Sequence, residues 1–418
     1  MKRPIVLVHG YSDRGKTYEA WKRVLTGEGG YEAGGIHICS YESLVNEINI
    51  DDIAEGFESI LASRGIGPGD EFDAIVHSTG MLVIRAWLTR YGSQNRRRLK
   101  HLIGLAPATF GSPLAHKGRS FLGAIFKSNR RLGPDFMETG DQVLDALELG
   151  SRFTWDLAHR DLLADPPVYG PDARTPYPFI LCGADGYTGL ASVVNSPGTD
   201  GTVRWAGAAF DTYKFTLDLT EEATAAKSTE KPRLPVPVYL IEGVNHGTIA
   251  SDPTATKELV LAALSVDRAD DFRAWCATAE AKTRAARTAA APWQQFILKV
   301  SDERGCGVSD YHLEFFTKDE NRRLNEEFDI DVHPYSTDKS FRAFHVNYAK
   351  VKPFQEKKLC VRALTHTGTG YATYVGRGAS RHWSAEIDLP SNFFYPFTTS
   401  LVEIKLNREV SDIIRWDR

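Results

Sequence analysis

The sequence predicts an α/β domain with a mostly parallel sheet, followed by an all-β sandwich domain. Continuous apolar runs recur in the first part of the chain with helical patterns between them, at residues 5–8, 72–76, 102–106, 179–182 and 236–241. Such runs are typical of parallel strands buried on both faces. After Trp293 apolar and polar residues alternate instead, as in residues 296–300, 312–315, 359–364 and 401–406. This alternation indicates short antiparallel strands of a sandwich.

The boundary between the two domains is predicted from a helical stretch between these patterns. Residues 252–290 are rich in Ala and Arg, and Pro292 follows shortly after them, as expected for a last helix that runs into a linker. We therefore place the first domain at residues 1–288 and the second at 289–418. Between residues 110 and 178 the strand rhythm lapses while apolar residues continue. Long insertions in compact domains are usually functional, so we expect a helical cap over the strand ends.

Composition and charge exclude several classes of protein. The 418 residues are 42% hydrophobic and 25% charged, which is ordinary for a globular protein. The net charge of −4 provides no global field that would recruit nucleic acid or an anionic membrane. The five cysteines are widely spaced without a C-x-x-C pair, which favours a reducing, cytoplasmic location over a disulfide framework. No apolar run approaches the roughly 18 residues of a membrane span. Secretion would require a signal peptide removed before residue 1.

The segment around Ser78 is the strongest functional signal. A short apolar run stops at this serine, Gly80 follows two places later, and an amphipathic pattern begins at once. This arrangement predicts a nucleophile elbow, a sharp strand-to-helix turn that exposes the serine over the end of a sheet. A small residue is needed at Gly80 because the helix backbone passes close to the strand. Val76 stands where the usual G-x-S-x-G motif has its first glycine.

A nucleophilic serine needs a base to accept its proton and a carboxylate to orient that base. His246 follows the apolar run at residues 236–241, which is where such a base is expected. Two aspartates compete for the third role. Asp185 lies closer to the end of its strand, whereas Asp200 lies in a turn-rich Asp-Gly-Thr-Val context. Both precede a glycine, a common turn pair, so position alone leaves the choice open.

Acyl transfer also needs backbone N–H groups directed at the developing oxyanion. We expect one from Thr79, at the start of the helix after the elbow, and one from Tyr11, in the loop after the first strand. His9 is expected to brace that loop. In the predicted cap, Phe110, Phe121 and Trp155 are candidates for an apolar pocket that binds the acyl group.

Together these motifs resemble those of α/β-hydrolase lipases and esterases, over roughly residues 1–265. The matching segments are residues 7–11, 76–80, 200–203 and 245–247, and residues 105–113 are similar to the strand-to-cap segment of bacterial lipases. The resemblance implies a Ser78–His246–Asp200 hydrolase that cleaves carboxylic esters, often lipids, without a cofactor. It favours Asp200 over Asp185. Thioesterase and phospholipase or deacylase activities would use the same groups. The second domain is not covered.

A nucleotide-binding protein is the remote alternative. Residues 10–17 match the P-loop pattern G-x-x-x-x-G-K-[ST] after an apolar run and before a helical pattern. Against this interpretation, Asp13 would place negative charge within a phosphate cradle. The P-loop interpretation also leaves the elbow and His246 unexplained.

Two further clusters complete the predictions. Asp156, His159 and Asp161 in the cap match no known ligand spacing, so we expect surface polar residues and no metal site. Aromatic residues surround Pro396 in the second domain, at Phe393, Phe394, Tyr395 and Phe397. They are candidates either for contact with a membrane or a ligand or for packing against the first domain.

Overall fold

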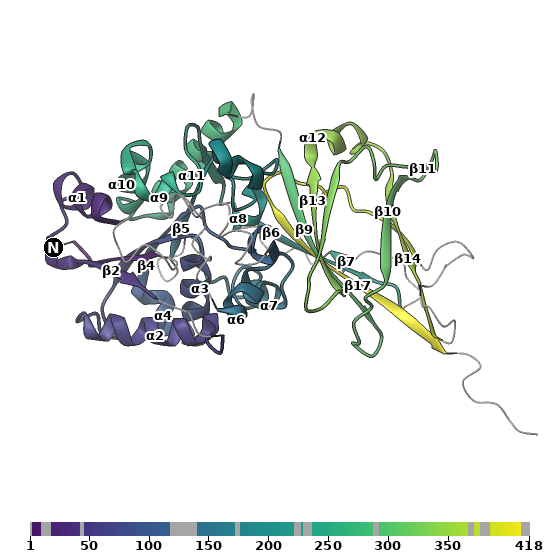
Figure 1. Ribbon diagram of the computed structural model, residues 1–418, viewed down its shortest axis with the longest axis horizontal. Helices are drawn as coiled ribbons and strands as arrows, with labels where there is room; N and C mark the ends of the chain where they lie inside the picture. The colour runs from purple at the N-terminus through teal and green to yellow at the C-terminus, as the bar shows by residue number, and fades with distance from the viewer. Residues whose placement is uncertain are drawn as a thin grey trace, which may run out of the picture. The chain divides into compact units, whose positions relative to one another are not determined.

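A computed structural model describes residues 2–9, 18–41, 46–117, 140–171, 176–220, 227–228, 236–286, 292–366, 372–376 and 385–410. The chain forms two compact units (Figure 1), each with its own sheets. The first unit comprises Met1–Asp211 and Leu234–Ala290, and the second comprises Thr212–Arg233 and Ala291–Arg418. Residues 212–233, which the sequence prediction assigned to the first domain, therefore belong to the second unit.

The first unit is built on a six-stranded sheet in the order β2-β1-β3-β4-β5-β8, in which every pair is parallel. The strands are β1 (Ile5–His9), β2 (Ile36–Ser40), β3 (Phe72–His77), β4 (Leu99–Leu105), β5 (Tyr177–Gly183) and β8 (Val238–Ile241). Five of them coincide with the predicted apolar runs. The sequence prediction missed β2 because it is a partly exposed edge strand without a continuous apolar run.

Helices connect these parallel strands (Figure 1). Helix α3 follows the elbow and is buried over residues 80–88. Helix α2 begins at a capping box in which Asn49 and Asp52 exchange two hydrogen bonds of 3.0 Å, which satisfies amides of its first turn. In the described part of the first unit, the helices and 3-10 helices outside the cap region are α1 (Glu19–Gly27), η2 (Ala33–Gly35), α2 (Ile50–Ser63), α3 (Gly80–Arg90), α4 (Ser93–Arg98), η5 (Gly189–Val194), α8 (Trp205–Ala208), α9 (Thr248–Ser251), η6 (Pro253–Ala255), α10 (Lys257–Leu264) and α11 (Ala269–Ala286).

The predicted cap region lies between β4 and β5, and its described part is helical, as expected. It contains η3 (Ala115–Lys117), α6 (Asp141–Leu147) and α7 (Arg152–Arg160). The side chain of Ser151 accepts a hydrogen bond from the Thr154 amide and so caps α7. Among all described residues, no helix is both long enough and apolar enough to cross a bilayer.

The second unit contains two sheets. The smaller has the order β11-β10-β14-β16, and the larger has the order β12-β13-β9-β17-β6-β7 with β15 paired to β17. Its strands are β6 (Thr212–Asp218), β7 (Lys227–Ser228), β9 (Trp293–Asp302), β10 (Tyr311–Thr317), β11 (Arg322–Arg323), β12 (Ile330–Pro334), β13 (Phe341–Asn347), β14 (Leu359–Thr365), β15 (Ala372–Val375), β16 (Ala385–Asp388) and β17 (Thr399–Val410). The short helices α12 (Tyr348–Val351) and η7 (Lys352–Phe354) follow β13.

The larger sheet is mixed, which corrects the prediction of a purely antiparallel sandwich. Strand β17 runs parallel to both of its neighbours, β9 and β6. Strand β6 precedes its partner β17 by more than 180 positions along the chain. Its alternating pattern could not reveal a partner so distant in sequence, because strand pairing is decided by tertiary packing.

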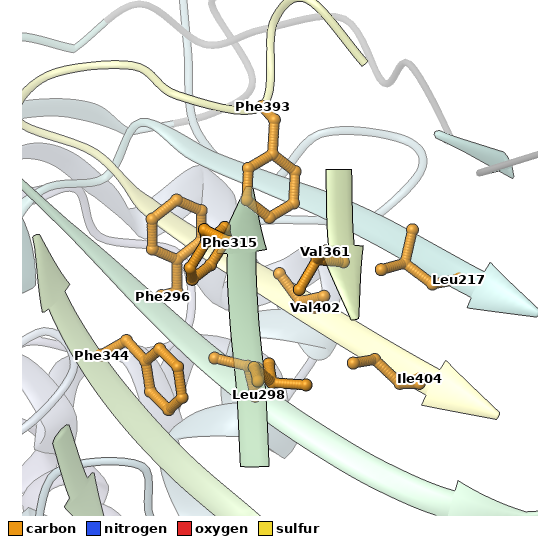
Figure 2. Close-up of a pocket in the computed structure, with 10 residues that line it drawn as sticks. Leu217, Phe296, Leu298, Phe315, Phe344, Val361, Phe393, Val402 and Ile404 are labelled. Atoms are coloured by element: carbon orange, nitrogen blue, oxygen red, sulfur yellow. The ribbon is translucent and has the colours of Figure 1, made fainter. Parts of the chain in front are cut away.

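Aromatic side chains form much of the apolar core of the second unit. Figure 2 shows Phe296, Phe315, Phe344 and Phe393 gathered with aliphatic side chains from several strands. The rings of Phe296 and Phe393 are stacked with centroids 4.9 Å apart. Of the four aromatic residues predicted to form an apolar loop, Phe393, Phe394 and Phe397 are buried and only Tyr395 is exposed. Phe393 and Phe394 thus belong to the core of the second unit itself. The predicted contacts with a membrane or ligand and with the first domain stay predictions.

Candidate active site

Ser78 occupies the sharp turn between β3 and α3. Its φ is +51°, in the left-handed region that costs energy for a residue with a side chain. A Cβ atom at Gly80 would lie 2.8 Å from the carbonyl oxygen of Val8 on the neighbouring strand β1. The helix backbone therefore passes too close to the sheet for any larger residue. Both features are those of the elbow predicted from the sequence.

Two residues larger than glycine, Val76 and Met81, lie beside the elbow. Val76 is fully buried in β3. The terminal methyl of Met81 lies over Gly104 in the adjacent strand β4, where an added Cβ would be only 2.7 Å from Cε of Met81. Gly104 therefore leaves room for the side chain of Met81.

Ser78, His246 and Asp200 form a continuous chain of hydrogen bonds. The Nε2 atom of His246 lies 3.1 Å from Oγ of Ser78, and Nδ1 lies 3.0 Å from Oδ2 of Asp200. All three side chains are buried. Because a carboxylate only accepts, Nδ1 of His246 carries the hydrogen. In neutral histidine the lone pair of Nε2 then accepts the hydroxyl hydrogen of Ser78.

The loop of Asp200 presents one carboxylate oxygen to the histidine. Oδ1 accepts hydrogen bonds from the amides of Thr202 at 3.0 Å and Val203 at 2.7 Å, so Oδ2 is left for His246. The main chain joins the same two loops, since the His246 amide donates to the Asp200 carbonyl at 3.0 Å. Cys182 lies nearby, and burial, reinforced by Asp200, raises the pKa of its thiol well above its usual value. This thiol is therefore neutral.

Asp185, the alternative acid, makes a different contact. It is exposed, and its Oδ2 accepts from the Gly243 amide at 2.6 Å while its own amide donates to Val244. It thus braces the loop that precedes His246, whereas the imidazole of His246 donates its hydrogen bond to Asp200. Gly183 lies beneath the same loop, where an added Cβ would be 2.2 Å from the carbonyl oxygen of Val244.

His77 is a site residue that sequence reasoning missed. Its Nε2 donates to the main-chain carbonyl of His246 at 2.9 Å, and the two rings lie 4.8 Å apart. The ring of His77 also lies near that of His9, with centroids 5.4 Å apart. The ring of His9 in turn lies near that of Tyr18, with centroids 5.3 Å apart. The sequence signal that could have identified His77 is its position, because it directly precedes Ser78 at the end of a buried strand.

Of the two predicted oxyanion donors, the structure describes Thr79 but not Tyr11. Thr79 is the N-cap of α3, where the first amides of a helix have no partner within the helix and carry partial positive charge. Tyr11 lies outside the described residues, as does the whole P-loop-like string at residues 10–17. Phe121 in the cap also lies outside them.

Phe110 follows β4 at the start of the predicted cap region, and Trp155 lies on α7 within that region. The guanidinium of Arg85 on α3 lies 5.8 Å from the ring centroid of buried Phe110. Trp155 is buried on α7, with its ring 5.1 Å from that of His159. Their predicted contact with an acyl group stays a prediction.

Asp161, expected at the surface, is instead buried. Its carboxylate accepts from Arg85 at 2.7 and 3.0 Å and from the Tyr169 hydroxyl at 2.8 Å. Asp156 pairs with Arg152 and His159 bonds to the Trp155 carbonyl, so the three residues weighed as metal ligands have separate partners. In the described ranges no group of three or more His, Cys, Asp and Glu could hold a metal ion.

Comparison with solved structures finds the same fold. No family model and no curated protein matches the sequence. The phospholipase PlaB from Legionella pneumophila superposes with a TM-score of 0.84 at 23% identity, covering 100% of this chain and 96% of that chain. A structure of PlaB in complex with thio-NAD gives the same values. The mature lipase BlEst2 from Bacillus licheniformis reaches a TM-score of 0.42 at 15% identity, covering 63% of this chain and 93% of that chain.

The likeness to PlaB extends over both units. The parallel sheet with its connecting helices, the elbow at Ser78 and this likeness agree with one another. The first unit has the α/β-hydrolase fold, and the second unit is β-rich.

Proposed function

We propose that this chain is a serine hydrolase that cleaves carboxylic esters of lipids. The observation that carries the proposal is the hydrogen-bonded chain from Ser78 Oγ through His246 to Asp200, with contacts of 3.1 and 3.0 Å. The strained backbone of Ser78 supports it, because such strain at a turn is retained where a side chain must be held for chemistry. A P-loop protein would have no use for this arrangement.

The proposed reaction proceeds through an acyl-enzyme. Oγ of Ser78 forms a bond to the ester carbonyl carbon while its proton passes to Nε2 of His246. Asp200 remains ionised and stabilises the imidazolium. The amide of Thr79, with that of Tyr11 as the proposed second donor, stabilises the tetrahedral oxyanion. His246 then protonates the leaving alcohol oxygen as the carbon–oxygen bond breaks. Water, activated by the same histidine, hydrolyses the acyl-enzyme.

Lipid esters are the proposed substrates for two reasons. The cap region supplies apolar side chains, including Phe110 and Trp155, with Phe121 as a further candidate. The protein with the same fold over the whole chain is a phospholipase by its name. Phospholipids are accordingly the first substrates to test. A thioesterase is the second candidate, since a thioester carbonyl is attacked by the same groups.

A chain-length series of soluble and dispersed acyl esters tests the proposal. Wild type should hydrolyse them and should be labelled by a fluorophosphonate, whereas Ser78→Ala should lose both activity and labelling. Activity retained in Ser78→Ala would show that the nucleophile lies elsewhere.

Two matched substitutions identify the acid. We expect Asp200→Asn to lower kcat by about 10³- to 10⁴-fold, because the amide favours the wrong tautomer of His246. Asp185→Asn should change kcat by less than about tenfold, since Asp185 contacts only the loop before His246. The reverse pattern would assign the role to Asp185.

A further inference from the structure

The segment from Gly186 to Thr199 lies between β5 and Asp200, and it exposes two apolar side chains. Leu190 is 88% exposed and Val193 is 65% exposed, which makes them the most exposed large apolar side chains among the described residues. Both belong to the 3-10 helix η5. Side chains three positions apart lie on the same side of such a helix, so the two form one apolar ridge.

Single exposed apolar side chains are common on protein surfaces and need no explanation. The chain has such residues on separate elements, including Ile60 on α2 and Val332 on β12, each 42% exposed. The ridge differs from these because two neighbouring positions are exposed together, and more fully.

The segment also carries no charge. Residues 186–199 contain no Asp, Glu, Lys, Arg or His, although 25% of all residues in the chain are charged. Burying an unpaired charge in an apolar medium is very unfavourable. This uncharged segment can therefore enter an apolar environment without that penalty.

Hydrogen bonds at its base hold the segment in place. The side chain of Asn195 accepts from the Tyr187 amide at 2.8 Å and donates to the Tyr187 carbonyl at 2.7 Å. The Tyr187 hydroxyl lies 2.7 Å from Oγ1 of Thr202, and Val194 is buried. The ridge is thus presented by a braced loop. The base of the segment is joined to the loop of Asp200, because Thr202 belongs to that loop.

We propose that the segment Gly186–Thr199 is an anchor that inserts Leu190 and Val193 into the surface of an uncharged lipid bilayer or micelle. The proposal rests on the proposed function, which requires substrate from a lipid phase. A fluid lipid surface needs no matching shape. A protein interface would instead centre on exposed aromatic or arginine side chains, which the segment lacks, since Tyr187 is buried.

Binding to vesicles tests the anchor independently of catalysis. Ser78→Ala protein is sedimented with phosphatidylcholine vesicles, and Leu190→Ser/Val193→Ser is introduced in the same background. The double variant should lower the partition coefficient at least about tenfold, since two apolar side chains leave the lipid. Ile60→Ser, at another exposed apolar position, is the matched control and should bind as the parent does. Equal binding of the parent and the double variant would overturn the proposal.

A fluorescent reporter gives a second readout. In Leu190→Trp, emission should shift to the blue with vesicles and should be quenched by brominated lipid. Emission that stays at its value in water while the protein sediments with vesicles would place the contact elsewhere and overturn the anchor.

Activity separates the two hypotheses. With Ser78 intact, the double variant should lose hydrolysis of vesicle lipid but retain hydrolysis of a short water-soluble ester. If no variant hydrolyses any ester, the proposed function fails while the vesicle experiment still decides the anchor. If both proteins bind vesicles equally but only the parent self-associates, the ridge is a protein contact and the proposal is wrong.

Discussion

His77 donates a hydrogen bond from Nε2 to the main-chain carbonyl of His246, with an N···O distance of 2.9 Å. The residue before the nucleophile thereby holds the main chain of the candidate base. One short contact joins the end of β3 to the loop after β8, two segments separated by almost 170 positions in the chain. Because catalytic geometry tolerates little displacement, we infer that His77 is a positioning residue for the proposed reaction.

Replacement of His77 tests this contact. His77→Phe keeps a ring but removes the donor, and we expect kcat to fall about tenfold or more, with KM much less affected, because the base is displaced. His77→Gln places an amide N–H near the position of Nε2 and should recover part of kcat. Steady-state kinetics on a soluble ester, with thermal unfolding as a check on folding, provide the measurement. Equal loss in both variants would indicate a purely structural role for His77.

The close approach of Gly183 to the loop before His246 leads to a second prediction about kcat. In Gly183→Ala the added Cβ would lie 2.2 Å from the Val244 carbonyl oxygen, so the main chain before His246 must move. We expect kcat to fall by about 10²-fold, the scale of a displacement near 1 Å. Gly243→Ala, on the same loop, has open space around its Cβ but a φ of +74°, so it strains the backbone without this clash. A smaller effect on kcat for Gly243→Ala is expected, and the opposite order would contradict the steric explanation.

The Arg85–Asp161 pair predicts an effect on stability. Both side chains are fully buried, and Arg85 also donates to the Thr109 carbonyl. Arg85→Met leaves the Asp161 carboxylate buried without its cation, so we expect the free energy of unfolding to fall by about 3–5 kcal/mol. Urea denaturation gives the measurement.

The same helix offers the control for this experiment. Arg90, also on α3, pairs with Glu55 at 2.7 Å, but both side chains are substantially exposed. Arg90→Met should change the free energy of unfolding by less than about 1 kcal/mol. Similar losses for the two variants would show that burial of the pair is not what matters.

The cysteines predict a pattern of chemical labelling. Burial raises the pKa of the Cys39 thiol to about 11 and that of the Cys276 thiol to about 12, and burial with Asp388 raises that of Cys360 to about 12. Burial also raises the pKa of Cys182. Only the thiolate reacts, so at pH 8 these four should label slowly, whereas exposed Cys306 should label at once. Mass spectrometry locates the label, and unfolded protein, which should label at all five positions, is the control. Rapid labelling of native Cys182 would contradict its burial.

Local signals made much of the site predictable. The elbow at Ser78 is marked within a few residues, since a strand, a nucleophile and a small residue must follow in order. His246 follows its strand directly. Asp200 was preferred from resemblance alone, because both aspartates begin turns, and only the folded loops show which one reaches the imidazole.

Contacts between distant segments were not predictable. The sequence indicated neither that β6 lies beside β17 nor that Asp161 is buried against Arg85. It also left undecided whether the aromatic residues near Pro396 are exposed, and three of the four are in the core.

The sequence by itself determined that parallel strands alternate with helices, where the turn at Ser78 lies, and in what order the candidate serine, acid and base occur. These features depend on short-range patterns of apolar residues and on turn geometry. Only the tertiary structure decided which acid reaches His246, which histidine holds it, and which apolar side chains are exposed. Those outcomes depend on packing between segments far apart in the chain, where side chains compete for burial and for hydrogen-bond partners that no local pattern specifies.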